Sequence, residues 1–248
     1  MQKFNSSGVE IAYEVWGQGP PILLIHGFAS NVFVNWRDTH WVKVLTEAGR
    51  QVIGIDNRGH GQSQKFYDPA DYSAPLMADD ATRLLDHLNI EQADVMGYSM
   101  GARIAAFMTM TYPARVRRAV FAGLASRMIT GVGGSDEIAA ALEAPSRDDV
   151  TDRMASGFRL FAEQTGSDLK ALAACIRSTR VKIKEEALAK ISVPVLVVAG
   201  ENDDVAGDVA GLTKIIPGSK GVVLPRRNHM NAVGDRGYKD AVLAFLKD

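Results

Sequence analysis

The sequence predicts an α/β protein: a mostly parallel sheet whose two faces are covered by helices. Short apolar runs alternate along most of the chain with stretches that carry apolar residues at helical spacing. This alternation is typical of repeated strand–helix–strand units, in which a helix connects one parallel strand to the next. The length of 248 residues suits one α/β domain, because a chain of that size buries a large core without disulfides or metal ions.

The first predicted elements are strands. Residues 9–16 alternate apolar with other side chains, as a half-buried strand does. A turn rich in glycine and proline at 17–21 leads to residues 22–25, an unbroken apolar run typical of a strand that is covered on both faces. Residues 51–56 predict another short buried strand, and residues 77–88 predict the first helix.

The alternation continues to the end of the chain with one interruption. The later elements predicted are a strand at 93–98, a helix at 101–111, strands at 116–122, 193–199 and 221–224, and a helix at 235–246. Between the strands at 116–122 and 193–199 the patterns are helical only, at 137–142, 148–165, 168–179 and 184–190. Because strands resume afterwards, we predict a helical cap at 124–190, inserted into a single core formed by 1–123 and 191–248.

Composition excludes several classes of protein. With 28 basic and 29 acidic residues, the chain has no charge excess that would favour nucleic acid or an anionic membrane as a partner. The single cysteine, Cys175, has no partner for a disulfide or a CxxC metal pair. No spacing of His, Cys or acidic residues fits zinc or an EF-hand, and no glycine-rich nucleotide loop is present, so neither a metal nor a cofactor is expected. No export signal or membrane span is evident, which predicts a cytoplasmic location.

Ser99 is the predicted nucleophile. It is the centre of the sequence GYSMG, which fits the pattern G-x-S-x-G and stands between the strand at 93–98 and the helix at 101–111. Such a strand–turn–helix is the setting of a serine on a sharp, strained turn. Glycines on both sides remove the Cβ atoms that would clash in so tight a bend.

A base and a carboxylate are needed to activate a serine hydroxyl. His229 follows the last predicted strand, at the edge of the sheet where ligands bind in open α/β folds. The carboxylate should lie between Ser99 and His229 in chain order. Asp203 and Asp204 both follow the strand at 193–199, and their loop position does not distinguish them.

The backbone amides of Phe28 and Met100 are the predicted oxyanion hole. Gly27 allows the chain to turn after the buried strand at 22–25, so that the Phe28 N–H can point to a substrate oxygen, and the Met100 N–H follows the nucleophile directly. His26 and His60 lie in neighbouring loops and are interpreted as structural residues.

Five segments resemble the α/β-hydrolase family across essentially the whole chain. They are the HGF segment at 26–28, the segment RGHGQS at 58–63, the GYSMG turn, the GENDD loop at 200–204 and the NHM segment at 228–230. The resemblance implies a sheet of about eight strands, a cap after the sixth, and Asp203 as the carboxylate, three residues after the loop glycine. The closest-looking members are bacterial carboxylesterases, enol-lactonases and cofactor-free perhydrolases. Epoxide hydrolases of this fold use aspartate where Ser99 stands, so the resemblance to them is one of fold.

The predicted function is hydrolysis of small carboxylic esters or lactones through a Ser-His-Asp triad and an acyl-enzyme. Three alternatives remain open: a carbon–carbon bond hydrolase with the same triad, a ligand sensor with slow turnover, and a perhydrolase side activity. The expected partner is a small-molecule substrate, and the chain is expected to be a monomer or homodimer.

The cap is expected to supply the substrate pocket. Phe28, Met100, Phe158 and Phe161 are the predicted substrate contacts. Met128, Leu160 and Leu172 are further candidates for an acyl pocket, and ordinary helix packing is an equal alternative for all of these cap residues. A basic run near the end of the cap is interpreted as a solvated helix face, with attraction of an anionic substrate as the alternative. It comprises Arg177, Arg180, Lys182 and Lys184.

Overall fold

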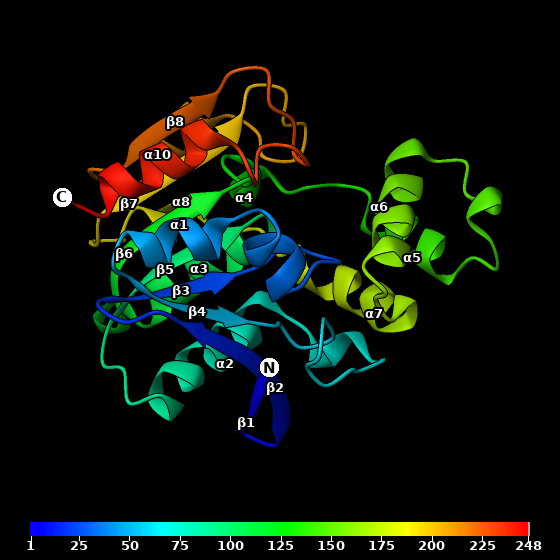
Figure 1. Cartoon of the computed structure of the whole chain (residues 1–248). Helices are drawn as coiled ribbons and strands as arrows, with labels where there is room; N and C mark the ends of the chain where they lie inside the picture. Colours follow the sequence, from blue (N-terminus) through cyan, green and yellow to red (C-terminus); the bar gives the residue numbers. More distant parts are fainter. Residues whose placement is uncertain (248) are drawn as a thin grey trace.

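A computed structural model of the chain describes residues 1–247 and contains one eight-stranded sheet (Figure 1). The strand order is β1-β2-β4-β3-β5-β6-β7-β8. The first two strands join the sheet antiparallel and the others pair in parallel. The predicted α/β class is therefore confirmed. The strands are β1 (Gln2–Ser6), β2 (Val9–Trp16), β3 (Pro21–Ile25), β4 (Gln51–Ile55), β5 (Ala93–Tyr98), β6 (Val116–Ala122), β7 (Val195–Gly200) and β8 (Lys220–Leu224).

Helices cover both faces of this sheet. On one face, α1 (Trp41–Glu47) and α10 (Arg236–Phe245) close a core that includes Trp36, Trp41 and Tyr238. On the other, α2 (Ala74–His87), α3 (Met100–Thr111) and α9 (Val209–Thr213) contribute to a second and larger core. Both faces of the inner parallel strands β3, β4, β5 and β7 are buried, which explains their unbroken apolar runs.

Five helices lie between β6 and β7, in the region where the sequence predicts a cap. They are α4 (Arg127–Thr130), α5 (Ser135–Glu143), α6 (Arg153–Gln164), α7 (Leu169–Thr179) and α8 (Glu185–Leu188). Helix α5 packs against both α6 and α7. Figure 1 shows these three grouped to one side of the sheet, apart from the helices that cover its faces.

Helix α6 begins later than the predicted 148 because two caps follow each other. Ser146 and Asp149 form a capping box at the start of the short helix η4 (Arg147–Asp149), so this turn forms a separate helix that ends at Asp149. The Asp152 carboxylate then accepts the Ala155 N–H and starts α6. The apolar periodicity runs through both turns, and only the caps separate them.

Several short elements lack a sequence signal that predicts them. Only Phe4 and Ser6 of β1 are buried, so this edge strand shows no apolar alternation. The π-helical turn η1 (Phe33–Arg37) and α1 are too short for a clear helical period. The 3-10 turns η2 (Pro69–Asp71) and η3 (Pro113–Arg115) begin at prolines. None of the helices in residues 1–247 is long and apolar enough to cross a membrane.

Candidate active site

Ser99 lies on a sharp turn at the middle of the sheet. Strand β5 ends at Tyr98 and α3 begins at Met100, which leaves Ser99 alone between them with φ 56° and ψ −114°. A positive φ is unfavourable for a residue with a Cβ, so the turn stores strain at this position. The predicted strand–turn–helix is present.

The glycines on either side of Ser99 are sterically required. A Cβ on Gly97 would lie 2.0 Å from the Gly101 carbonyl oxygen, and a Cβ on Gly101 would lie 2.0 Å from the carbonyl oxygen of Ile25. Each contact is with backbone, which cannot move aside as a side chain does. Strand β3, which ends at Ile25, thus presses closely on the start of α3.

The His229 imidazole lies against the Ser99 hydroxyl. Its Nε2 is 3.0 Å from Ser99 Oγ, a hydrogen-bond distance. His229 lies in the loop between β8 and α10, far from Ser99 in the sequence. The buried Tyr98 hydroxyl donates a hydrogen bond of 2.6 Å to the His229 carbonyl oxygen and so anchors this loop beside the turn.

Asp203 lies on the other side of the imidazole. The His229 Nδ1 is 3.0 and 2.9 Å from the two oxygens of the Asp203 carboxylate. One of these oxygens also accepts the N–H groups of Val205 and Ala206, at 3.0 and 2.9 Å, so the carboxylate is buried and fixed. Asp204 is exposed and takes no part in this contact. Of the two aspartates that loop position left open, the structure brings Asp203 to the imidazole.

These hydrogen bonds define the chemistry of the imidazole. When Nδ1–H donates to the carboxylate of Asp203, Nε2 is the acceptor that faces the hydroxyl of Ser99. A proton can then pass from Oγ to Nε2, and the carboxylate stabilises the imidazolium that forms.

Two backbone amides next to Ser99 are free to bind an anion. Within residues 1–247, neither the Phe28 N–H nor the Met100 N–H has an acceptor. The turn before Phe28 approaches the nucleophile closely, since a Cβ on Gly27 would lie 3.4 Å from Ser99 Cβ. Two side chains hold this turn: the Asn35 Oδ1 accepts the Gly27 N–H at 3.0 Å, and the His26 Nδ1–H donates to the Gly27 carbonyl at 2.8 Å.

His26 and His60 are buried behind the same turn. The His26 Nε2 accepts the Asn57 N–H at 3.0 Å, and the His60 Nδ1–H donates to the Arg58 carbonyl at 3.0 Å. Burial lowers the pKa of His26 to about 4 and that of His60 to about 3. Both imidazoles are therefore neutral at pH 7. The contacts fit the predicted structural role, because they hold loops and do not reach Ser99.

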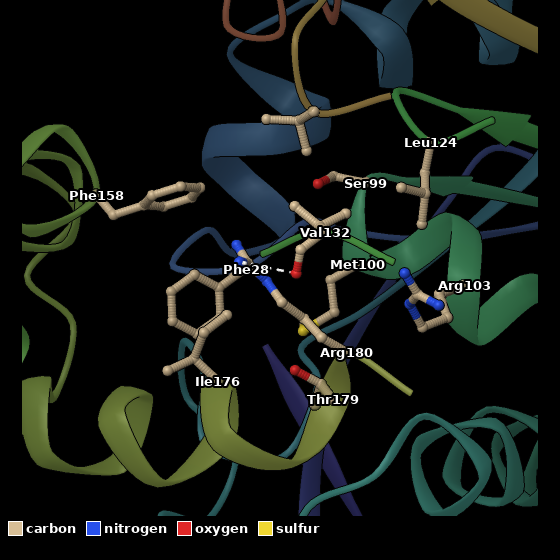
Figure 2. Close-up of a pocket in the computed structure, with 11 residues that line it drawn as sticks. Phe28, Ser99, Met100, Arg103, Leu124, Val132, Phe158, Ile176, Thr179 and Arg180 are labelled. Carbon is tan, nitrogen blue, oxygen red and sulfur yellow. Dashed lines mark hydrogen bonds between the residues drawn. The ribbon is translucent and has the colours of Figure 1, made fainter. Parts of the chain in front are cut away.

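Two cavities meet at Ser99. The first, which we call the arginine pocket, has a volume of about 30 Å³, and Figure 2 shows its walls. The second, which we call the histidine pocket, has a volume of about 240 Å³ and a mainly apolar lining. Besides Ser99, the arginine pocket is lined by Phe28, Met100, Arg103, Leu124, Val132, Phe158, Ile176, Thr179, Arg180 and Val205. The histidine pocket is lined by Gly27, Phe28, Ser30, Val34, Asn35, Thr39, Tyr98, Phe158, Phe161, His229, Met230 and Val233.

The predicted aromatic contacts from the cap line these cavities. Phe158 lines both pockets and Phe161 lines the histidine pocket. Three other cap candidates line neither. Met128 and Leu172 are fully buried in the core, and Leu160 is 39% exposed, because α6 turns its phenylalanines toward Ser99 and Leu160 away. The expectation that these three line an acyl pocket was wrong.

Two arginines of the basic run near the end of the cap lie in different surroundings. Arg177 is exposed and forms an ion pair with Glu143 at 2.7 Å, as the solvated-face interpretation predicts. Arg180 instead lines the arginine pocket, where α7 has ended and the chain turns inward. For Arg180 the solvated-face interpretation was wrong.

Most of the residues that line the pockets were not predicted from the sequence, and three of them have polar groups that shape the site. Arg103, Asn35 and Tyr98 line the pockets or hold the loops that form them. Arg103 had a signal: it is an arginine on a helix otherwise made of small and apolar residues, four positions after Ser99. Asn35 and Tyr98 had none, because their roles depend on which loops meet in space.

Comparisons with known proteins agree with this architecture. A family model for the alpha/beta hydrolase fold matches residues 20–133. The non-heme chloroperoxidase CPO-A1 of Kitasatospora aureofaciens is 37% identical over 114 residues, 46% of this chain and 40% of that protein. The 2-hydroxymuconate semialdehyde hydrolase of Pseudomonas sp. (strain CF600) is 35% identical over 135 residues, 54% of this chain and 46% of that protein. Thus the matched segment spans less than half of either relative.

Solved structures are similar over the full chain, and an enol-lactonase is among them. The enol-lactonase from Burkholderia xenovorans LB400 superposes with a TM-score of 0.84 at 20% sequence identity, covering 100% of both chains. At this identity the similarity concerns the fold.

Proposed function

Because the chain is an α/β-hydrolase fold protein, we propose that it is a serine hydrolase of small carboxylic esters or lactones. Ser99 attacks the substrate carbonyl while His229 accepts its proton through Nε2. Asp203 keeps the imidazole in the required tautomer and stabilises its cation. The Phe28 and Met100 amides bind the oxyanion of the tetrahedral intermediate.

The second half of the reaction uses the same groups. His229 gives its proton to the leaving alkoxide, which departs and leaves an acyl group on Ser99. Water then enters, His229 removes one of its protons, and the resulting hydroxide attacks the acyl carbonyl. Collapse of the second tetrahedral intermediate returns the proton to Ser99 and releases the acid.

One observation carries the proposal: the hydrogen-bonded chain from Ser99 Oγ through His229 to Asp203. Its distances of 3.0 Å and 2.9 Å are hydrogen-bond distances, which proton transfer requires. Ordinary packing of a serine does not require an imidazole and a carboxylate in this order. The strained turn and the two unpaired amides beside Ser99 support the same reaction.

A first prediction tests the nucleophile. We expect Ser99→Ala to abolish the burst of p-nitrophenol released from p-nitrophenyl acetate, because no acyl-enzyme can form. Residual catalysis of about 10³-fold over water would remain from binding and the oxyanion hole. The intact protein should be labelled on Ser99 by a fluorophosphonate. Undiminished turnover in the variant would contradict the proposal.

A second candidate is a carbon–carbon bond hydrolase that uses the same residues. The similarity to a 2-hydroxymuconate semialdehyde hydrolase over about half of the chain favours it. A dienoate substrate distinguishes the two: the second candidate cleaves it rapidly and leaves short aryl esters nearly untouched, whereas the ester hydrolase does the reverse. Both reactions would be lost in Ser99→Ala.

A further inference from the structure

The arginine pocket contains two guanidinium groups and no carboxylate partner for either. Arg103 projects from α3 and Arg180 follows α7, so two distant segments bring positive charge to one small cavity beside Ser99 (Figure 2). No acidic side chain in residues 1–247 lies within 4.0 Å of either group. Glu137 influences Arg180 from a longer distance without forming an ion pair.

This arrangement is unlike the other buried arginines. Arg58 is 6% exposed and pairs with Asp80 at 2.7 Å. The partly buried Arg117 pairs with the buried Asp94 at 2.6 Å, and other arginines share that carboxylate. A buried charge normally needs such a partner, because desolvation without one costs several kcal/mol, on the order of the stability of a domain. In the arginine pocket neither group has such a partner: Arg103 is 2% exposed and Arg180 is partly buried.

Carbonyl oxygens hold the two groups in place. Arg103 donates to the carbonyls of Met128 and Val181, and Arg180 donates through Nη1 to those of Val132 and Gly133. The Arg180 Nη2 and Nε have no acceptor in the described chain, so both are free for a ligand. Burial and mutual repulsion lower the pKa of Arg103 to about 10, and burial lowers that of Arg180 to about 10. Both remain positively charged at pH 7.

We propose that Arg180, with Arg103 behind it, binds a carboxylate carried by the acyl part of the substrate. The substrate class is then the monoester of a short dicarboxylic acid with an apolar alcohol. Two parallel N–H groups of a guanidinium match a carboxylate in geometry and charge. This inference rests on the proposed function, because it assigns the acyl side of that reaction.

The position of His229 decides which side of the ester enters which pocket. The imidazole must reach the leaving oxygen to protonate it. It lines the histidine pocket and does not line the arginine pocket. The leaving alcohol therefore occupies the histidine pocket, and the acyl group extends toward Arg180.

The cavity sizes agree with this assignment. A volume of about 30 Å³ accommodates a short chain only, since about 10–15 Å³ on this measure holds one water. A volume of about 240 Å³ exceeds the ~150 Å³ that is sufficient for benzene. Phe161, Val34 and Val233 provide an apolar lining there.

Three benzyl-type esters test the proposal. Monobenzyl succinate carries a carboxylate on the acyl side, benzyl butanoate has a methyl group in its place, and 4-(butanoyloxymethyl)benzoate carries the carboxylate on the alcohol side. We expect the wild-type kcat/KM to be about tenfold or more higher for monobenzyl succinate than for either butanoate. The factor is typical of a hydrogen bond to a charged group. A higher kcat/KM for 4-(butanoyloxymethyl)benzoate would overturn the assignment of the acyl group to the arginine pocket.

Variants of Arg180 and Arg177 test which arginine causes the preference for the ester with an acyl-side carboxylate. In Arg180→Gln the ratio of kcat/KM for monobenzyl succinate to that for benzyl butanoate should fall about tenfold or more, and Arg180→Lys should restore part of it. The matched control is Arg177→Gln, which removes an exposed charge outside both pockets and should leave the ratio unchanged. A ratio that is equal in wild type and Arg180→Gln would overturn the proposal.

A binding measurement separates this inference from the proposed function. Calorimetry of monobenzyl succinate with Ser99→Ala should show a Kd that rises about tenfold or more when Arg180→Gln is added. If no ester is hydrolysed but this dependence holds, the reaction is wrong and the carboxylate site stands. If all three esters are hydrolysed equally through Ser99, the reaction stands and the carboxylate site is wrong.

Discussion

At the scale of single residues, the local surroundings of each side chain decide between neighbours of identical chemistry. Asp203 and Asp204 are adjacent carboxylates on one loop. Only Asp203 turns inward, because the N–H groups of Val205 and Ala206 hold its carboxylate below the imidazole of His229. Arg177 and Arg180 differ in the same manner: one pairs with Glu143 at the surface and the other faces Ser99.

The two aspartates provide a matched pair for a second prediction. We expect Asp203→Asn to lower kcat toward p-nitrophenyl acetate by about 10⁴-fold, because an amide at this position favours the wrong imidazole tautomer. Asp204→Asn should stay within a few-fold of wild type, since this side chain is exposed and does not contact His229. Steady-state kinetics on both variants, with circular dichroism to verify folding, is the measurement. If kcat fell strongly in Asp204→Asn only, Asp204 and not Asp203 would be the carboxylate that orients His229.

At the scale of elements, the turn between β5 and α3 depends on a close approach of two backbones. Strand β3 ends against the first turn of α3, and Gly101 is the residue that lets them meet. This contact positions the Ser99 hydroxyl and both unpaired amides at the carboxyl edge of the sheet. A ligand site at such an edge is typical of parallel α/β sheets.

A pair of glycine substitutions tests that contact. Gly101→Ala should lower the free energy of unfolding by about 1–3 kcal/mol, because the new Cβ meets the backbone oxygen of Ile25 and the backbone must shift. Gly157→Ala is the matched control, since Gly157 lies inside α6 with nothing within 4 Å of a Cβ there. That variant should gain about 0.5–1 kcal/mol from helix propensity. Urea unfolding of both proteins provides the comparison, and equal stability would contradict the steric argument.

At the scale of the whole molecule, loops from opposite ends of the sequence form the site. The turn after β3, the turn after β5 and the loops after β7 and β8 lie at one edge because their strands run parallel. The helices α6 and α7 close this edge with Phe158 and Arg180. His26 and His60, buried behind the oxyanion turn, link the stability of this assembly to pH.

The free energy of unfolding should fall as the pH decreases from about 6.5 toward 4. Burial lowers the pKa of His26 to about 4 and that of His60 to about 3, so the unfolded chain binds protons in this range before the folded chain does. Above about pH 6.5 both histidines are neutral in both states and add no slope. Burial raises the pKa of the neighbouring Asp56 carboxyl, which opposes the trend at low pH.

A histidine variant isolates this effect. His60→Gln should flatten the dependence of unfolding free energy on pH between about 6.5 and 4 relative to wild type, whatever its effect on absolute stability. His40→Gln, at an exposed histidine outside the cluster, should retain the wild-type slope. Urea unfolding at half-unit steps of pH measures both. Parallel curves for wild type and His60→Gln would show that this histidine does not set the slope.

Much of the fold was predictable because its signals are local. Apolar runs and helical periods along the chain predicted seven of the strands and the long helices, and GYSMG predicted the turn that carries Ser99. The edge strand β1, the short turns and the late start of α6 were not predictable in this way. They depend on a neighbouring strand or on capping hydrogen bonds that leave no apolar period.

By itself the sequence determined the class of the fold, the order of its elements and the residue types required for acyl transfer. Each of these follows from neighbours in the chain. Only the tertiary structure decided that Asp203 faces His229, that Leu160 points outward and that Arg103 meets Arg180 beside Ser99. These are contacts between segments far apart in the sequence, and the packing of loops and helices around the sheet selects them.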